Sequence, residues 1–186
     1  QDEAHETNKL PQYMADLMAK GVLGNKTGAG FFKKDGKTRL ALDIASGDYK
    51  PVSEIKLPNL DYIDDVSFLH SQGRYEEGMA TFLEAQGDEA AIARKVIAGY
   101  ISYAFHRVGE ATETITEIDM IMGSGFNWAP PSVLVDTFGA AGAVKLIDGA
   151  GLPVPKAIIA AAESATPTRF FNAPSHVNTG KFFVAG

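Results

Sequence analysis

The chain has 186 residues, of which 45% are hydrophobic and 22% charged, a composition typical of a globular protein with one domain or two small ones. Its 17 Lys and Arg against 23 Asp and Glu give a formal net charge of −6 at pH 7, which argues against nucleic acid or an anionic membrane surface as a partner. Cysteine is absent, which excludes disulfides, thiolate metal sites and thiol nucleophiles and is compatible with a cytoplasmic location. No apolar run approaches the roughly 18 residues of a membrane span, so we expect none.

The first part of the chain combines a short helix with a small β-structure. Residues 10–21 carry apolar side chains at helical spacing and end at a glycine. A glycine-rich loop over residues 24–30 leads into Phe31-Phe32, and alternating side chains around two small-residue turns predict a β-hairpin through residue 52. Pro51 and Pro58 then bracket a predicted linker.

From Asp61 onward the pattern is helical. The strongest helix is predicted over residues 88–109, where eight apolar residues fall within half of the helix circumference. This stripe, which we expect to face a helical core, consists of Ala93, Val96, Ile97, Tyr100, Ile101, Ala104, Phe105 and Val108.

Helix boundaries can be read further along the chain. Thr114 and Glu117 form a capping box that opens the next helix, and Gly123 and Gly125 end it. Pro130-Pro131 suits the first turn of another helix. Residues 181–184 are predicted to form a C-terminal strand. Asn178–Phe183 echoes Asn25–Phe32, which predicts two copies of one helical unit, with most of the first copy upstream of Gln1.

No catalytic constellation is evident in the residues. Neither glycine loop has the spacing of a phosphate-binding or dinucleotide-binding motif, so we expect no nucleotide cofactor bound by this chain itself. The four histidines are not at metal-ligand spacing, and we predict no metal site. The basic run Lys33, Lys34, Lys37 and Arg39 has two interpretations, a phosphate contact or the lysines that commonly protect an edge strand.

Two stretches resemble one enzyme family. Residues 10–32, ending in Leu23-Gly24-Asn25-Lys26-Thr27-Gly28-Ala29-Gly30-Phe31-Phe32, resemble the signature that closes the C-terminal domain of 3-hydroxyacyl-CoA dehydrogenases. Residues 118–139, from Ile118-Asp119 through Phe126-Asn127-Trp128-Ala129-Pro130-Pro131 to Asp136 and Gly139, resemble a second motif of that domain. The resemblance covers residues 10–52 and 88–186 well and residues 53–87 poorly, and its order is similar to that of multidomain bacterial β-oxidation enzymes.

The resemblance implies a fold and a domain organisation. The fold is expected to be mainly α, a helical bundle like the C-terminal domain of 6-phosphogluconate dehydrogenase, with a small β-hairpin and a C-terminal strand. Residues 1–52 would be the tail of a first helical repeat plus the hairpin, residues 53–87 a linker with short helices, and residues 88–186 a second C-terminal domain.

The resemblance also implies where the chemistry lies. The family's NAD loop and its His-Glu catalytic pair belong to a Rossmann domain, so we predict no catalytic and no cofactor-binding residue in this chain. The family's substrate-fixing Asn has no counterpart in residues 95–100, and its Gly-Pro is Pro130-Pro131 here, which puts a glycine-dependent close approach in doubt. What transfers is structural: Gly24, Gly28 and Gly30 in one turn, and Gly123, Gly125 and Asp136 around the other.

We therefore expect a fragment of a cytoplasmic, NAD-dependent 3-hydroxyacyl-CoA dehydrogenase of fatty-acid β-oxidation, inactive by itself. Its expected partners are acyl-CoA through the parent enzyme, an upstream Rossmann domain, and optionally a downstream enoyl-CoA hydratase module or a second copy. Met122, Phe126 and Trp128 are candidates for the apolar lining of the substrate cleft, with plain core as the alternative. Two rival interpretations stay open, a purely structural dimerisation or docking module and the helical domain of another Rossmann-type hydroxyacid dehydrogenase.

Overall fold

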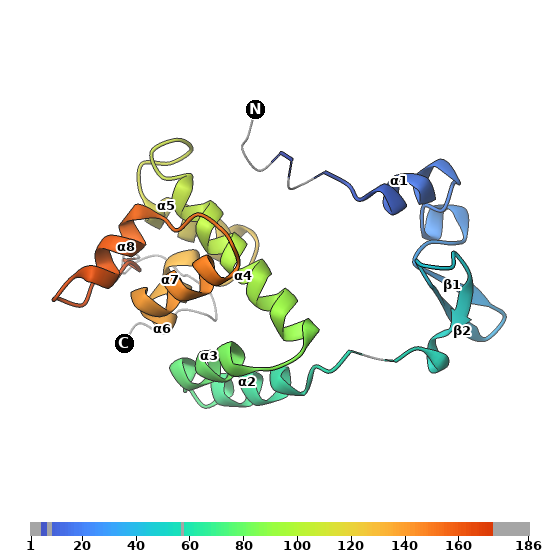
Figure 1. The fold of residues 1–186 in the computed structure, drawn as a ribbon, viewed down its shortest axis with the longest axis horizontal. Helices are drawn as coiled ribbons and strands as arrows, with labels where there is room; N and C mark the ends of the chain where they lie inside the picture. Colours follow the sequence, from blue (N-terminus) through green and yellow to red (C-terminus); the bar gives the residue numbers. More distant parts are fainter. Residues whose placement is uncertain (1–4, 7–8, 57, 173–186) are drawn as a thin grey trace. The chain divides into compact units, whose positions relative to one another are not determined.

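The computed structural model describes residues 5–6, 9–56 and 58–172, which are drawn as a ribbon in Figure 1. The chain divides into two compact units, unit 1 at residues 1–58 and unit 2 at residues 59–186. Unit 2 is mainly helical and unit 1 carries a small antiparallel sheet, so the predicted fold class is confirmed. The predicted strand at residues 181–184 lies outside the described residues, as does the segment 178–183 that echoes residues 25–32.

Unit 1 is built around a three-stranded antiparallel sheet of order β1-β2-β3, one strand more than a hairpin. In its register Phe32 lies opposite Ala41, Lys34 opposite Arg39, and Leu42 opposite Tyr49. The elements of unit 1 are α1 (Gln12–Ala19), η1 (Asn25–Thr27), β1 (Phe32–Asp35), β2 (Thr38–Leu42), β3 (Tyr49–Pro51) and η2 (Val52–Glu54).

The glycine-rich loop of unit 1 is a closed turn that needs glycine at specific places. The Gly24 amide donates to the Ala29 carbonyl at 2.8 Å, and Gly28 has a φ of 78°. A Cβ on Gly30 would lie 2.7 Å from the Gly24 Cα, so the two chain segments touch backbone to backbone. Because only glycine permits this approach, the loop is explained by turn geometry without any bound phosphate.

Unit 2 packs its helices around α4, which runs through the unit in Figure 1 and contacts α6 and α7. The α2–α3 pair packs onto the unit through α3 and α6, and α8 packs on α7. The helices of unit 2 are α2 (Asp61–Ser71), α3 (Tyr75–Glu84), α4 (Asp88–His106), α5 (Ile115–Met120), a π-helical turn η3 (Ile121–Gly125), α6 (Pro131–Phe138), α7 (Ala140–Gly149) and α8 (Lys156–Glu163). The core consists of Ala98, Ile101, Phe105, Leu134, Val135, Ala143, Leu146, Ile147 and Ile158.

The α2–α3 pair belongs to the compact part of unit 2. Phe82 of α3 is buried and its ring stacks on that of Phe138 of α6, with centroids 6.5 Å apart. The two compact units divide after residue 58, and the assignment of residues 1–52, 53–87 and 88–186 to repeats and a linker stays a prediction.

The long helix α4 differs in two places from the predicted apolar stripe. Val96 belongs to the stripe but is 55% exposed. Ser102 is buried, and its hydroxyl donates to the Pro153 carbonyl at 2.7 Å, which satisfies a polar group inside the core. The buried face of α4 is therefore rotated from the centre of the stripe toward Ala98, Ser102 and Phe105.

Candidate functional site

The segment between α5 and α6 forms an irregular loop that presents aromatic side chains. The capping box predicted at Thr114 and Glu117 is present at the start of α5, and the helix continues as the π-helical turn η3. The amides of Phe126 and Trp128 both donate to the Met122 carbonyl, at 3.3 and 3.0 Å. Asn127 between them has a φ of 54°, the only positive φ of a non-glycine residue in the described part of the chain. We call residues 121–130 the aromatic loop.

A buried carboxylate fixes the far end of the aromatic loop. Asp119 of α5 is 2% exposed, and its carboxylate accepts hydrogen bonds from the backbone amide of Ser132, at 3.1 Å, and from the Ser132 hydroxyl. Burial raises the pKa of Asp119 to about 6, because it outweighs the two hydrogen bonds that favour the charged form. The pair ties α5 to the first turn of α6, so the loop between them is held at both ends.

Tyr100 of α4 supports the middle of the aromatic loop. Its hydroxyl donates to the Ala129 carbonyl at 2.9 Å, and its ring meets the Trp128 ring edge to face, with centroids 5.6 Å apart. Burial, reinforced by the charge of Asp119, raises the pKa of Tyr100, so the phenol stays protonated as a donor. Trp128 is thus held in place although it lies at the surface.

The predicted cleft residues lie together on this loop, and two of them are not core. Phe126 is 64% exposed and Trp128 52% exposed, whereas Met122 is partly buried. The plain-core alternative is therefore wrong for Phe126 and Trp128. Irregular backbone and positive φ values of non-glycine residues concentrate at functional sites, because the surrounding structure has to hold them.

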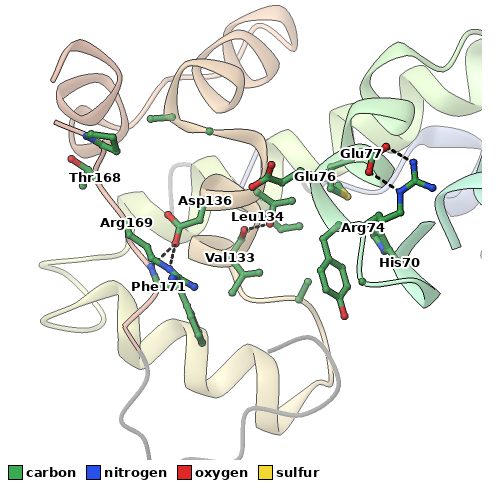
Figure 2. Close-up of a pocket in the computed structure, with 18 residues that line it drawn as sticks. His70, Arg74, Glu76, Glu77, Val133, Leu134, Asp136, Thr168, Arg169 and Phe171 are labelled. Atoms are coloured by element: carbon green, nitrogen blue, oxygen red, sulfur yellow. Dashed lines mark hydrogen bonds and ion pairs between the residues drawn. The ribbon is translucent and has the colours of Figure 1, made fainter. Parts of the chain in front are cut away.

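A separate groove of about 770 Å³ lies between α3, α6 and residues 167–171 of unit 2 (Figure 2). Its rim carries Arg74, which pairs with Glu77, and Asp136, which lies toward Arg169 and Phe171. Met122, Phe126 and Trp128 do not line this groove, although Ala129 at the end of the aromatic loop does. The groove and the aromatic loop are thus two distinct features of unit 2.

Asp136 was expected beside a turn together with Gly123 and Gly125, but the structure gives it a longer-range contact. The two glycines lie in η3, and Asp136 lies within α6. Its carboxylate accepts hydrogen bonds from the backbone amides of Phe170 and Phe171, at 2.8 and 2.9 Å. Asp136 therefore anchors a segment that follows it by more than 30 residues.

The histidines do not form a catalytic pair within the described residues. His70 at the end of α2 lines the groove, but its Nε2 is buried against Gly78 of α3 without a hydrogen-bond partner. Burial lowers the pKa of His70, which keeps the ring neutral. His106 is exposed and its Nδ1 lies 2.7 Å from the Ser102 carbonyl. His176 lies outside the described residues.

Nothing in the described part of the chain has the geometry of a metal or dinucleotide site. The structure shows no cluster of three or more His, Asp or Glu able to hold a metal ion in that part. The sheet of unit 1 is antiparallel, and neither glycine turn joins a parallel strand to a helix as a dinucleotide fold requires. The prediction that this chain binds no nucleotide cofactor by itself stays a prediction. In the same part of the chain, each helix is too short or too polar to cross a membrane.

Sequence reasoning missed Asp119 and Tyr100 as the supports of the aromatic loop. Asp119 lies in the second motif, and an acidic residue flanked by Ile118 and Met120 in the helix before Pro130-Pro131 is the signal that could have marked it. Tyr100 was placed in the apolar stripe. Its hydroxyl was the signal there, because a phenol that is partly buried still needs a hydrogen-bond acceptor.

Comparison with curated proteins finds a distant relative that carries a functional name. A probable 3-hydroxyacyl-CoA dehydrogenase of Bacillus subtilis (strain 168) is 25% identical over 151 residues, which are 81% of this chain. The matched region is 18% of the relative, so the chain spans less than a fifth of that protein's length. No family model matches the chain, and no solved structure matches it. The match supports a relationship to the dehydrogenase family.

Proposed function

We propose that this chain is the helical part of an NAD-dependent 3-hydroxyacyl-CoA dehydrogenase and forms one wall of its substrate cleft. The observation that carries the proposal is the aromatic loop, where Phe126 and Trp128 are exposed on a backbone held by Asp119 and Tyr100. The similarity to the B. subtilis protein supports the reaction class.

In this proposal the reactive groups lie on a Rossmann domain of the same polypeptide. Oxidation of the substrate moves a hydride from C3 to NAD and the hydroxyl proton to a base, which requires both groups within about 3 Å of the reacting atoms. The aromatic loop would contribute apolar surface that covers the acyl-CoA and excludes water. Rigid support of the aromatic loop matters in this proposal, because a displaced loop would misplace the substrate and lower the rate of oxidation even when the catalytic groups are intact.

An alternative function is a docking module without a role at the cleft. The exposed face of α4 favours it, because Ile92, Val96 and Tyr103 lie at helical spacing on one side of the helix and are all exposed. Such an apolar face is typical of a surface that meets another protein domain.

The test compares the 186-residue chain with the longer polypeptide that this proposal predicts, in which a Rossmann domain precedes it. We expect the longer polypeptide to form NADH from 3-hydroxybutyryl-CoA and the short chain to form none. In the longer polypeptide, Trp128→Ala should lower kcat/KM by about tenfold, the effect of losing one large apolar contact with substrate.

The matched control is Phe68→Ala on α2, which removes an aromatic ring that is 62% exposed and lies outside the aromatic loop. Equal effects of the two substitutions would contradict the cleft-wall role and favour the docking module. NADH formation by the pure short chain would contradict the division of labour.

A further inference from the structure

Unit 1 contains a concentration of positive charge that the proposed cleft wall does not explain. Residues 26–39 hold five cationic side chains and one acidic one in a chain whose net charge is −6. The five are Lys26, Lys33, Lys34, Lys37 and Arg39. Most of them lie on the β1–β2 hairpin.

The register of the sheet determines on which of its two faces each of these cationic side chains lies. Lys34 of β1 lies directly opposite Arg39 of β2, so both side chains project from one face, together with Phe32. Lys33 projects from the other face, where its ammonium lies 4.0 Å from the centre of the Tyr49 ring. We call the face with Phe32, Lys34 and Arg39 the cationic face.

Protection of an edge strand does not account for the cationic face. Lysines commonly protect edge strands, and β1 is at an edge, but Arg39 lies on β2, the central strand. Like charges directly opposite each other on one face destabilise a sheet. Neither Lys34 nor Arg39 forms an ion pair in the described part of the chain, so the repulsion is not relieved by a carboxylate there.

Phe32 adds an aromatic surface beside the two cations. The Arg39 guanidinium lies 4.6 Å from the centre of the Phe32 ring, and Phe32 is 52% exposed. An exposed ring next to two cations that form no ion pair suits a phosphorylated nucleoside, because the base stacks on the ring and the phosphate binds the cations.

We propose that the cationic face binds the phosphorylated adenosine end of CoA, with Lys34 and Arg39 on the 3′-phosphate and Phe32 beside the adenine. This inference rests on the proposed function, which makes acyl-CoA the substrate. The 3′-phosphate is a monoester that carries close to two negative charges at pH 7, which two adjacent cations can balance. NAD lacks this group, although it shares the adenosine and the diphosphate.

The test measures binding of CoA, 3′-dephospho-CoA and NAD to the 186-residue chain by calorimetry at low salt. We expect CoA to bind, and 3′-dephospho-CoA and NAD to bind at least about tenfold more weakly, since charge-assisted bonds to the 3′-phosphate are lost. Lys34→Gln and Arg39→Gln should each weaken CoA binding by about tenfold. The matched control is Lys33→Gln, which removes the same charge from the same strand on the opposite face and should change affinity less than about twofold.

Three results would overturn the site. The first is that CoA shows no detectable binding. The second is that CoA, 3′-dephospho-CoA and NAD bind equally, and the third is that Lys33→Gln and Lys34→Gln weaken CoA binding equally. Either of the last two would indicate general electrostatic attraction rather than a defined binding site. The proposed function is judged separately by the activity of the longer polypeptide. An active longer polypeptide together with a 186-residue chain that does not bind CoA would remove the cationic-face site and leave the dehydrogenase assignment standing.

Discussion

Asp119 and Ser132 are 13 residues apart in the sequence, and the Asp119 carboxylate caps the amino-terminal end of α6 through the backbone amide and hydroxyl of Ser132. Pro130 and Pro131 precede that amide and carry no N–H, so Ser132 provides the first backbone donor of the helix. A proline at the N-cap position also cannot supply a capping side chain. A distant aspartate therefore performs the role that a local Ser, Thr or Asp usually performs.

Asp119 should make the stability of unit 2 depend on pH. Burial raises its pKa to about 6 from an ordinary value of 3.8, so the folded chain binds this proton more tightly than the unfolded chain. The stabilisation is complete below pH 4 and is lost as the pH rises through 6. We expect the free energy of unfolding to fall by about 2 kcal/mol between pH 4 and pH 7.5 through this group, measured by urea unfolding.

Asp119→Asn should remove most of this slope, because an amide keeps an acceptor for the Ser132 amide and does not titrate. The exposed Asp65 of α2 provides the control, and Asp65→Asn should leave the slope as in the unmodified chain. A slope that survives Asp119→Asn would show that another group is responsible.

Asp136 should hold residues 167–172 against the rest of unit 2. It accepts two backbone hydrogen bonds, and the adjoining Phe170 ring meets Phe105 edge to face with centroids 5.3 Å apart. Asp136→Ala leaves two amides without their acceptor and should cost about 1–3 kcal/mol of stability. Amide hydrogen exchange at Phe170 and Phe171 should accelerate, whereas Asp148→Ala on the exposed side of α7 should leave both rates unchanged. Unchanged exchange in Asp136→Ala would show that ring packing alone holds the segment.

Local patterns predicted the helices of unit 2 well, because helix formation depends on residues three or four positions apart. The periodicity of residues 88–109 located α4, and the Thr114–Glu117 capping box located the start of α5. Both signals are contained within a few turns of one helix.

The supports of the candidate site could not be predicted in this way, because their partners are remote in the sequence. Asp119 binds Ser132, 13 residues later, and Tyr100 binds the Ala129 carbonyl, 29 residues later. Periodicity also cannot tell an exposed apolar side chain from a buried one, which is why Val96 was expected in the core and lies at the surface.

Gly78 should be required for close packing of α2 against α3. A Cβ at this position would lie 2.5 Å from Cδ2 and 2.7 Å from Nε2 of His70. Gly78→Ala should therefore destabilise unit 2 by about 1–3 kcal/mol through overpacking, despite the better helix propensity of alanine.

The control is Gly142→Ala in α7, where the new Cβ would meet the Phe138 Cβ at an ordinary 3.6 Å. The free energy of unfolding of that variant, measured in urea, should be unchanged or higher by up to about 1 kcal/mol. Similar losses in both variants would contradict a specific contact with His70.

Trp128 is the only tryptophan of the chain, so its fluorescence reports directly on the aromatic loop. Tyr100→Phe removes the hydrogen bond to the Ala129 carbonyl but keeps the ring contact with Trp128, and should cost about 1 kcal/mol. Tyr100→Ala removes both supports and should increase the quenching of Trp128 by acrylamide beyond that of Tyr100→Phe. The control is Tyr62→Ala on α2. This variant also removes a tyrosine ring, but the Tyr62 ring packs near Phe82, with centroids 6.3 Å apart, and not near Trp128. Equal quenching in Tyr100→Ala and Tyr62→Ala would show that Tyr100 does not hold the aromatic loop in place. A lower kcat/KM of Trp128→Ala in the longer polypeptide would then need another explanation.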